Sequence, residues 1–259
     1  MDIQQTSQAI EKYVRPQTFP VAVRLFDESE AVPEKARQPK RDFNLTMPVC
    51  QGISLVRRYG WSLVMSQADM LCPLGSLTLG FVPARKKFLE GDFDIPFWVR
   101  DKSIRAKMSR SLPRLEYGRF TRIVMAPVHK AAFEPQVVIY YGNPAQLSRF
   151  AQAEAYATGE AVTAGTSGGF ACGAEITQPI LTETCQLVIT GGGDRAIAQA
   201  QDHEAAFAIP AGRMESIAQG LEATHKAGMR YPTPSFMLYQ AQFPPAFSEL
   251  MRYLESEGE

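Results

Sequence analysis

The chain has 259 residues, of which 45% are apolar, and its 27 basic side chains balance its 27 acidic ones. A chain of this length and apolar content can bury a large core without metals or disulfides, which excludes a disordered protein. The net charge of zero gives no global attraction to nucleic acid or to an anionic membrane, so we expect neither as a partner.

One stretch departs from this balance, because residues 85–130 carry 12 basic and 5 acidic side chains. We interpret it first as an ordinary solvated surface. A contact with an anionic small molecule or protein, and a contact with nucleic acid, are the alternatives.

The polar N-terminal residues 1–14 lack the basic start and the apolar segment of a secretory signal, so we expect a cytoplasmic protein. The longest apolar runs, 123–128 and 137–141, are far shorter than the roughly 20 residues that a membrane-spanning helix requires. In the reducing cytoplasm the four cysteines are expected to remain unpaired thiols.

The first part of the chain alternates helix, strand and loop signals. Residues 4–14 predict a short amphipathic helix that ends before Pro16, because proline disfavours helical geometry in the residue before it. The β-branched and aromatic residues at 21–26 predict a strand, and a long exposed connection is expected at 27–45. The next expected elements are a helix from Pro48 to Gly60, a strand at 61–65, a helix that begins at Pro73, a basic connection, and a helix at 101–110.

The second part begins with two expected strands, at 122–125 and 136–141. Asn143-Pro144 opens a helix that Gly159 closes, because proline suits the first turn of a helix and glycine suits the left-handed residue after it. The remaining expected elements are a strand at 186–190, a glycine-rich loop at 191–195, a strand at 205–209, a helix around Met214 to Leu221, and a last helix at about 245–255.

The order of these elements predicts two related halves, residues 1–115 and 116–259. Strand 21–26 matches strand 137–141, and a glycine precedes Cys72 and Cys172 at nearly the same spacing. A degenerate duplication would place these two cysteines at related positions of one seam. The alternative is a pair of generic helix-strand-helix units. The expected fold class is α+β, with two related α/β halves, mixed sheets and helices on the outer faces.

Several short motifs resemble those of domain-of-unknown-function family 169. They are the strand Pro20–Phe26, the Cys50 helix that ends in Tyr59-Gly60, the steps Cys72-Pro73-Leu74-Gly75 and Cys172-Gly173-Ala174, and the glycine-rich turn that ends at Arg195 before Ala208-Ile209-Pro210. The similarity extends over about residues 8–227. The resemblance implies no activity, because the family is named for the lack of one. It also implies a further cysteine in the glycine-rich turn, where this chain has glycines, so a thiol ligand there would have to come from Cys185.

Cys50, Cys72 and Cys172 are the strongest candidates for chemistry. They are too far apart in sequence for a local zinc knuckle, but folding could bring three thiolates together around an iron–sulfur cluster, or around a zinc with one open position. Their places at predicted helix N-termini would lower the thiol pKa, which favours metal binding and nucleophilic attack. The alternatives are a catalytic or redox thiol and ordinary core thiols, since free cysteine packs as a small apolar group.

The turn formed by Gly191, Gly192 and Gly193, followed by Arg195, is the candidate ligand-binding segment. Glycines let the backbone approach a ligand closely, and a guanidinium can bind a carboxylate through two hydrogen bonds. An anionic small molecule is therefore the expected ligand. An ordinary surface turn capped by an arginine is the alternative.

No standard nucleotide-binding, metalloprotease or hydrolase motif is present in the chain. The leading interpretation is a cytosolic redox or transfer enzyme with a cysteine-ligated iron–sulfur cluster or metal and an anionic small-molecule substrate. The alternative is a cofactor-free small-molecule-binding or regulatory module that holds its ligand between the halves.

Overall fold

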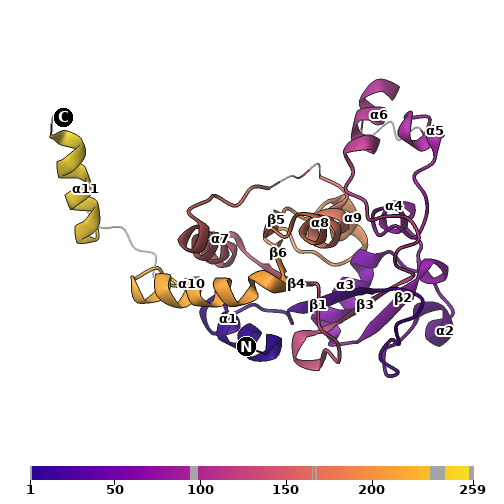
Figure 1. The fold of residues 1–259 in the computed structure, drawn as a ribbon, viewed down its shortest axis with the longest axis horizontal. Coiled ribbons are helices and arrows are strands. Elements are labelled where there is room, and N and C mark those ends of the chain that lie inside the picture. The colour runs from indigo at the N-terminus through magenta and orange to yellow at the C-terminus, as the bar shows by residue number, and fades with distance from the viewer. Residues whose placement is uncertain (1, 94–98, 165, 167, 234–242, 257–259) are drawn as a thin grey trace.

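The centre of the molecule is one six-stranded sheet with helices on both faces (Figure 1). The computed structural model describes residues 2–93, 99–164, 166, 168–233 and 243–256. The strands are β1 (Val21–Phe26), β2 (Leu63–Ser66), β3 (Arg122–Pro127), β4 (Val137–Gly142), β5 (Gln186–Val188) and β6 (Ala205–Pro210). The α+β class expected from the sequence is confirmed.

The strand order is β2-β3-β1-β4-β6-β5, and every pairing among the described strands is antiparallel. The mixed sheets expected from the sequence are therefore replaced by one antiparallel sheet. β3 lies between β1 and β2, and β6 lies between β4 and β5. β1 and β2 therefore run in the same direction but are not paired with each other, and the same holds for β4 and β5.

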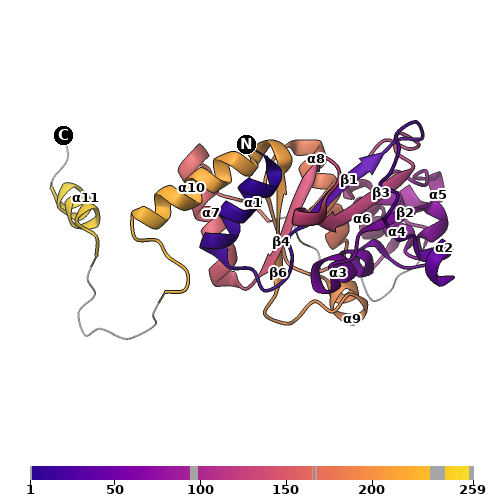
Figure 2. The same cartoon turned by 90° about the horizontal axis from the view of Figure 1, so that it is seen from below.

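Two sets of helices cover the two faces of the sheet (Figure 2). Because side chains alternate along a strand, Ala22, Tyr140 and Phe207 face one layer and Val23, Ile139 and Ala208 face the other. The first layer consists of α1 (Ile3–Val14), α7 (Pro144–Thr158) and α10 (Met214–Lys226). The second consists of α3 (Val49–Tyr59), α4 (Pro73–Thr78), the π-helical turn η3 (Gly173–Thr177) with α8 (Gln178–Thr182), and α9 (Gly192–Ile197).

Several short elements lie outside these layers. They are α2 (Pro39–Phe43), α5 (Lys86–Leu89), α6 (Lys102–Ser111), α11 (Pro245–Glu255) and the 3-10 turns η1 (Gln67–Asp69), η2 (Val128–Lys130) and η4 (Ala211–Arg213). Figure 1 shows α5 and α6 projecting together from the first half, and α11 standing far from the sheet. The helices α6 and α11 were expected. α2 and α5 fall in segments expected to be connections, because helices of 5 and 4 residues are too short to show an apolar period.

The expected helix ends are confirmed where capping signals are strong. Asn143 accepts a hydrogen bond from the Gln146 N–H, and the Gln146 side chain accepts one from the Asn143 N–H, which forms a capping box at the start of α7. Gly159 and Gly60 end α7 and α3 in the left-handed conformation. The glycine-rich segment expected as a loop at 191–195 instead forms α9.

Each half of the sheet uses the same strand order. β1 and β4 are central, β3 and β6 lie next to them, and β2 and β5 form the edges. The two sets of three strands therefore share one strand order. β3 pairs with β1 and β2, so the first unit extends through β3, and the topology marks the boundary between β3 and β4 rather than at residue 115.

The shared strand order shows which cysteines occupy equivalent positions in the two halves, and these differ from the pair expected from the sequence. The helix α3 leads into β2 and η3 with α8 leads into β5, so Cys50 and Cys172 hold equivalent places. The helix α4 follows β2 and α9 follows β5, so Cys72 corresponds to the turn at 191–193. The sequence-based match of Cys72 with Cys172 was wrong. The glycine spacing behind it compared the ends of α3 and α7, which lie on opposite faces of the sheet.

Candidate functional site

Three of the four cysteines lie at the seam between the halves, on one face of the sheet. Cys50 is in the first turn of α3, Cys72 is the N-terminal cap residue of α4, and Cys172 directly precedes η3. All three are partly buried free thiols. We call these three residues the thiol cluster.

The pKa values of Cys50 and Cys172 respond to burial and to their neighbours in the thiol cluster. Burial raises the pKa of Cys50 to about 12, and nearby acidic groups, which are Asp194, Glu175 and Cys72, add to this shift. Burial also raises the pKa of Cys172 well above its usual value, and the charges of Cys50 and Cys72 raise it further. The expected lowering by helix N-termini is therefore wrong for Cys50 and Cys172, because loss of water outweighs the helix dipole.

Cys185 lies apart from the thiol cluster. It is buried in the core on the opposite face of the sheet, immediately before β5. Its Sγ lies 3.5 Å from Oε2 of Glu154, and burial raises its pKa. Cys185 therefore does not replace a thiol in the glycine-rich turn.

A fully buried carboxyl, Glu175, lies beside the thiol cluster. Tyr141 of β4 donates a hydrogen bond of 2.9 Å to its Oε1, and its Oε2 has no hydrogen-bond partner among the described residues. Burial, followed by the negative charge of Asp194, raises the pKa of Glu175 to about 8. Glu175 is thus mostly protonated near neutral pH, and a protonated carboxyl can donate a proton or a hydrogen bond to a bound molecule.

A buried arginine supplies positive charge next to these groups. Both terminal nitrogens of Arg57 on α3 donate hydrogen bonds of 2.9 Å to Glu204, and the guanidinium lies 4.1 Å from the centroid of the Tyr141 ring. Arg57 belongs to the first half, whereas Glu204 and Tyr141 belong to the second. This ion pair therefore crosses the seam and fixes α3 against the other half.

The π-helical turn η3 links Cys172 to the helix that starts at Cys72. Thr78 of α4 and Thr177 of η3 share two hydrogen bonds, one between their hydroxyl groups at 3.0 Å and one from the Thr177 hydroxyl to the Thr78 carbonyl at 3.1 Å. A Cβ atom at Gly173 would lie 3.0 Å from Oγ1 of Thr78, so η3 packs tightly against α4. Such π-helical turns occur frequently at functional sites.

The glycine-rich turn presents Asp194 to the thiol cluster. Gly191 caps α9 and donates its N–H to Oδ2 of Asp194 at 2.9 Å. A Cβ atom on Gly191 would lie 2.7 Å from the carbonyl oxygen of Gly168, so only glycine fits there. Gly192 and Gly193 have open space at the corresponding position. Asp194 is buried, and burial raises its pKa.

Arg195 forms its contacts with the loop that follows α9. It donates a hydrogen bond of 2.8 Å to the carbonyl oxygen of Gln201 and pairs with Asp202 at 3.2 Å. It lines none of the cavities described around α4, β2, α3, α8 and α11. The loop that follows α9 holds the guanidinium through these two contacts.

Sequence reasoning missed Glu175, Asp194, Tyr141 and Arg57. Charged residues in helical segments usually face solvent, so nothing in the local pattern distinguished them. The one usable signal was Asp194 itself, because an acidic residue three positions after a small residue often caps a helix.

A family profile described as uncharacterised ArCR proteins, domain of unknown function 169, matches residues 9–220. The chain belongs to this family. The match runs from α1 into α10, so both halves of the sheet and the whole thiol cluster lie in the domain of unknown function 169, and α11 lies beyond it. No curated protein and no solved structure gives a match.

In the described part of this family 169 domain, no three His, Cys, Asp or Glu side chains are placed to hold a metal ion. The three thiols of the cluster are therefore not arranged as the ligands of a metal ion in the described part of the chain. No described helix combines the length and the apolar character needed to cross a membrane.

Proposed function

We propose that the protein is a cytosolic redox or group-transfer enzyme whose thiol cluster, Cys50, Cys72 and Cys172, holds an iron–sulfur cluster or a thiophilic metal. One observation carries this proposal: three free thiols from both halves lie near one seam, close enough that a negative charge on Cys50 or Cys72 would raise the pKa of Cys172. Thiolate is the ligand type that iron–sulfur clusters require and that zinc accepts.

Metal binding would offset the cost of ionising the buried thiols Cys50 and Cys172. Burial keeps Cys50 and Cys172 protonated, and a metal ion would supply the positive charge that makes their thiolates favourable. Because no three ligands are placed for a metal in the described residues, binding also requires the thiol side chains to rotate toward one another.

The fourth ligand position would remain open to a substrate. The counterpart of Cys72 in the second half is the turn Gly191–Gly193, which offers no side-chain ligand. Three protein ligands and one open position are typical of catalytic rather than structural zinc sites. Glu175, mostly protonated near neutral pH, would donate a proton to a small anionic substrate there.

Anaerobic purification followed by reconstitution with iron and sulfide, or with zinc, tests this proposal. We expect bound iron and sulfide with absorption near about 400 nm, or about one zinc per chain without colour. Cys50→Ser, Cys72→Ser and Cys172→Ser should lose most of the metal, and Cys185→Ser should retain it as the matched control. Protein that binds neither metal, or an equal loss in Cys185→Ser, would contradict the proposal.

The alternative function is a cofactor-free module that binds a small molecule at the same seam. Two observations favour it, the partnerless Oε2 of Glu175 and the absence of three placed metal ligands among the described residues. A chain that stays metal-free after reconstitution would favour this module over the metalloenzyme.

A further inference from the structure

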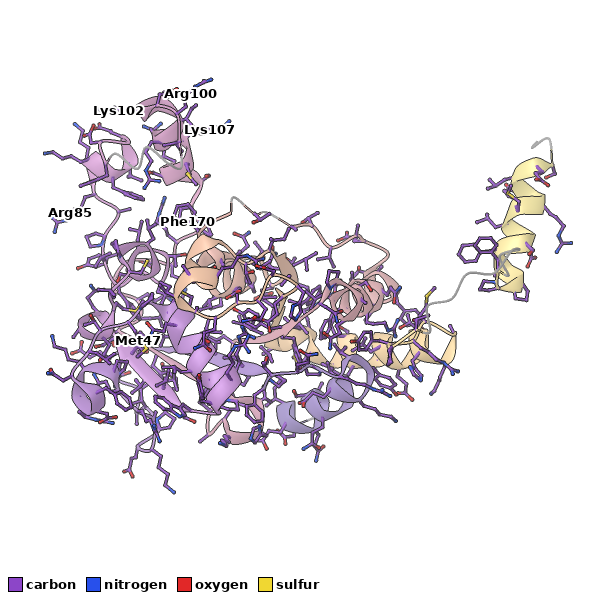
Figure 3. All side chains as sticks on the ribbon, turned by 180° about the vertical axis from the view of Figure 1, so that it is seen from behind. Met47, Arg85, Arg100, Lys102, Lys107 and Phe170 are labelled. Carbon is purple, nitrogen blue, oxygen red and sulfur yellow. The ribbon has the colours of Figure 1, made fainter. Side chains whose placement is uncertain are left out.

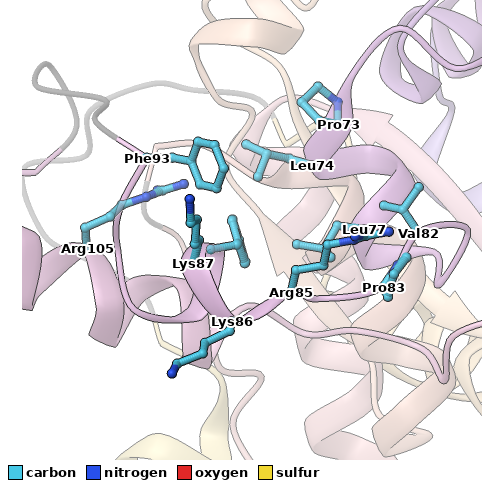
Figure 4. Close-up of a pocket in the computed structure, with 11 residues that line it drawn as sticks. Pro73, Leu74, Leu77, Val82, Pro83, Arg85, Lys86, Lys87, Phe93 and Arg105 are labelled. Atoms are coloured by element: carbon cyan, nitrogen blue, oxygen red, sulfur yellow. The ribbon is translucent and has the colours of Figure 1, made fainter.

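A separate cavity lies between α4 and the projecting pair α5 and α6. Its volume is about 710 Å³, and its lining residues include Leu74 and Leu77 of α4, Phe88 of α5, and Phe93 (Figure 4). Pockets of roughly 300–1,000 Å³ are the size that small molecules occupy in proteins. The walls are almost entirely apolar, so they favour a ligand with a hydrocarbon body.

One cationic side chain, Arg105 of α6, is buried at this cavity. It is only 3% exposed, and Figure 4 shows it pointing toward Phe93 at the cavity. Its Nε has no hydrogen-bond partner, Nη1 contacts only the sulfur of Met108 at 3.8 Å, and the guanidinium lies 5.6 Å from the Phe88 ring centroid. No carboxylate among the described residues pairs with it. Burial of a charge without such a partner is costly, and burial lowers the pKa of Arg105.

The backbone of the hairpin holds Arg105 in this place. Gly91, between α5 and α6, has a φ of +78°, and a Cβ atom there would lie 2.5 Å from the Lys102 carbonyl oxygen. Only glycine allows this close approach, which fixes the start of α6 against the end of α5.

Three further basic residues, Arg85, Lys86 and Lys87, line the cavity beside its apolar side chains. Lys87 extends toward Arg105 and Phe93, and Arg85 lies on the opposite side of the same opening (Figure 4). Among the described residues, no acidic side chain lines the cavity. Two acidic residues of the hairpin pair with lysines instead, Glu90 with Lys86 and Asp92 with Lys102. Other cations of the same hairpin, including Arg100 and Lys107, project outward from it (Figure 3).

We propose that this cavity binds an amphipathic anion, a molecule with an apolar chain and a single carboxylate or phosphate head. The head lies against Arg105 and Lys87, which supply charge and hydrogen-bond donors. The chain lies along Leu74, Leu77 and Phe88. A fatty acid and an alkyl phosphate share this chemistry. The site goes beyond the proposed metal function and does not depend on it, although both involve α4.

Isothermal titration with four twelve-carbon probes tests the proposal. The probes are dodecanoate, dodecyl phosphate, dodecanol and dodecyltrimethylammonium. We expect at least one anion to bind, with the neutral and cationic probes about tenfold or more weaker, because a charge-assisted hydrogen bond is lost. The stronger of the two anions identifies the head group. Binding of neither anion, or equal binding of dodecanol, overturns the proposal.

Two variants distinguish a ligand role for Arg105 from a structural role. Arg105→Met should weaken anion binding by about tenfold to a hundredfold, while the melting temperature of the ligand-free protein stays unchanged or rises, because the charge has no internal partner. Leu77→Trp, which fills the cavity, should also weaken binding. Lys107→Ala, on the exposed side of α6, is the matched control and should bind normally. A lower melting temperature with unchanged affinity in Arg105→Met overturns the proposal.

Discussion

Glu175 illustrates how the fold alters the chemistry of a single side chain. It belongs to η3 and is wholly buried, and the two groups that favour its charged form are Tyr141, through a hydrogen bond, and Arg57. Burial and the neighbouring Asp194 outweigh them and raise the pKa to about 8. Removal from water is therefore the dominant effect at this position.

This shift predicts that the stability of the protein depends on pH. Folding raises the pKa of Glu175 from 4.5 to about 8, so the native state binds more protons than the unfolded state between these values. The free energy of unfolding should therefore fall as pH rises through this range, by up to about 1.4 kcal/mol per pH unit. Glu175→Gln should flatten this dependence and raise the melting temperature at about pH 8.

Thermal denaturation followed by circular dichroism from about pH 5 to pH 8 measures this effect. Some slope should persist in Glu175→Gln, because burial also raises the pKa of Asp194. The control is Glu222→Gln, which removes an exposed carboxylate paired with Lys226 and should keep the wild-type slope. Identical slopes in Glu175→Gln and the wild type would refute the account of a buried, protonated acid.

At the residue scale, the sequence identified thiols more readily than acids. Cys50, Cys72 and Cys172 were recognisable because cysteine is rare and chemically distinctive. Glu175 and Asp194 become unusual only when tertiary structure removes water from them, and no local pattern records that burial. The ligand-binding role of Arg195 stays a prediction. The sequence did not show that Gln201 and Asp202, in the loop after α9, contact its guanidinium.

At the scale of elements, α7 and α10 are in unusually close contact. A Cβ atom on Gly220 of α10 would lie 2.5 Å from the carbonyl oxygen of Ala153 and 2.9 Å from its Cα atom. Gly52 of α3 is also crowded, but there the nearest atoms are the flexible ends of Met125 and Met65, at 2.8 and 3.1 Å. The backbone of Ala153 cannot move away from an added Cβ atom as easily as the flexible end of a methionine side chain can.

Gly220→Ala should therefore destabilise the protein by about 2 kcal/mol, although alanine is favoured over glycine in a helix by roughly 1 kcal/mol. Gly52→Ala should change the free energy of unfolding by less than about 1 kcal/mol, because the helix propensity offsets a small rearrangement of methionine. Urea denaturation of both variants measures the difference. Equal stability of Gly220→Ala and the wild type would show that the two helices can separate at little cost.

The sequence predicted where the long helices and strands lie in the chain, but not which elements pair or pack with one another. The Asn143-Pro144 start and the Gly159 end delimited α7 because capping is a local interaction. The glycines at 191–193 concealed α9, since glycine lowers helix propensity and the helix has only 6 residues. Strand order depends on contacts between distant segments, so the sequence predicted mixed sheets where the structure has one antiparallel sheet.

At the scale of the whole molecule, the two halves share a strand order, and each half is stabilised by contacts with the other. β1 and β4 pair at the centre of the sheet, with Val21 opposite Ile139 and Val23 opposite Val137. α1 comes from the N-terminus yet packs against α10 and α7 of the second half, and Ser7 of α1 forms a hydrogen bond of 2.8 Å with Tyr140. The boundary between the units therefore cuts through the core and is not a linker.

Separate fragments test this view. Residues 1–133 and 134–233 should each fail to show a cooperative thermal transition, because separation exposes β1 and β4 as apolar edges and leaves Arg57 and Glu204 without each other. Mixing the two fragments should restore helical circular dichroism and a single transition. A chain ending at residue 233 is the control and should melt like the full chain, since no residue of α11 is buried. Cooperative unfolding of either fragment alone would instead establish that half as an independent domain.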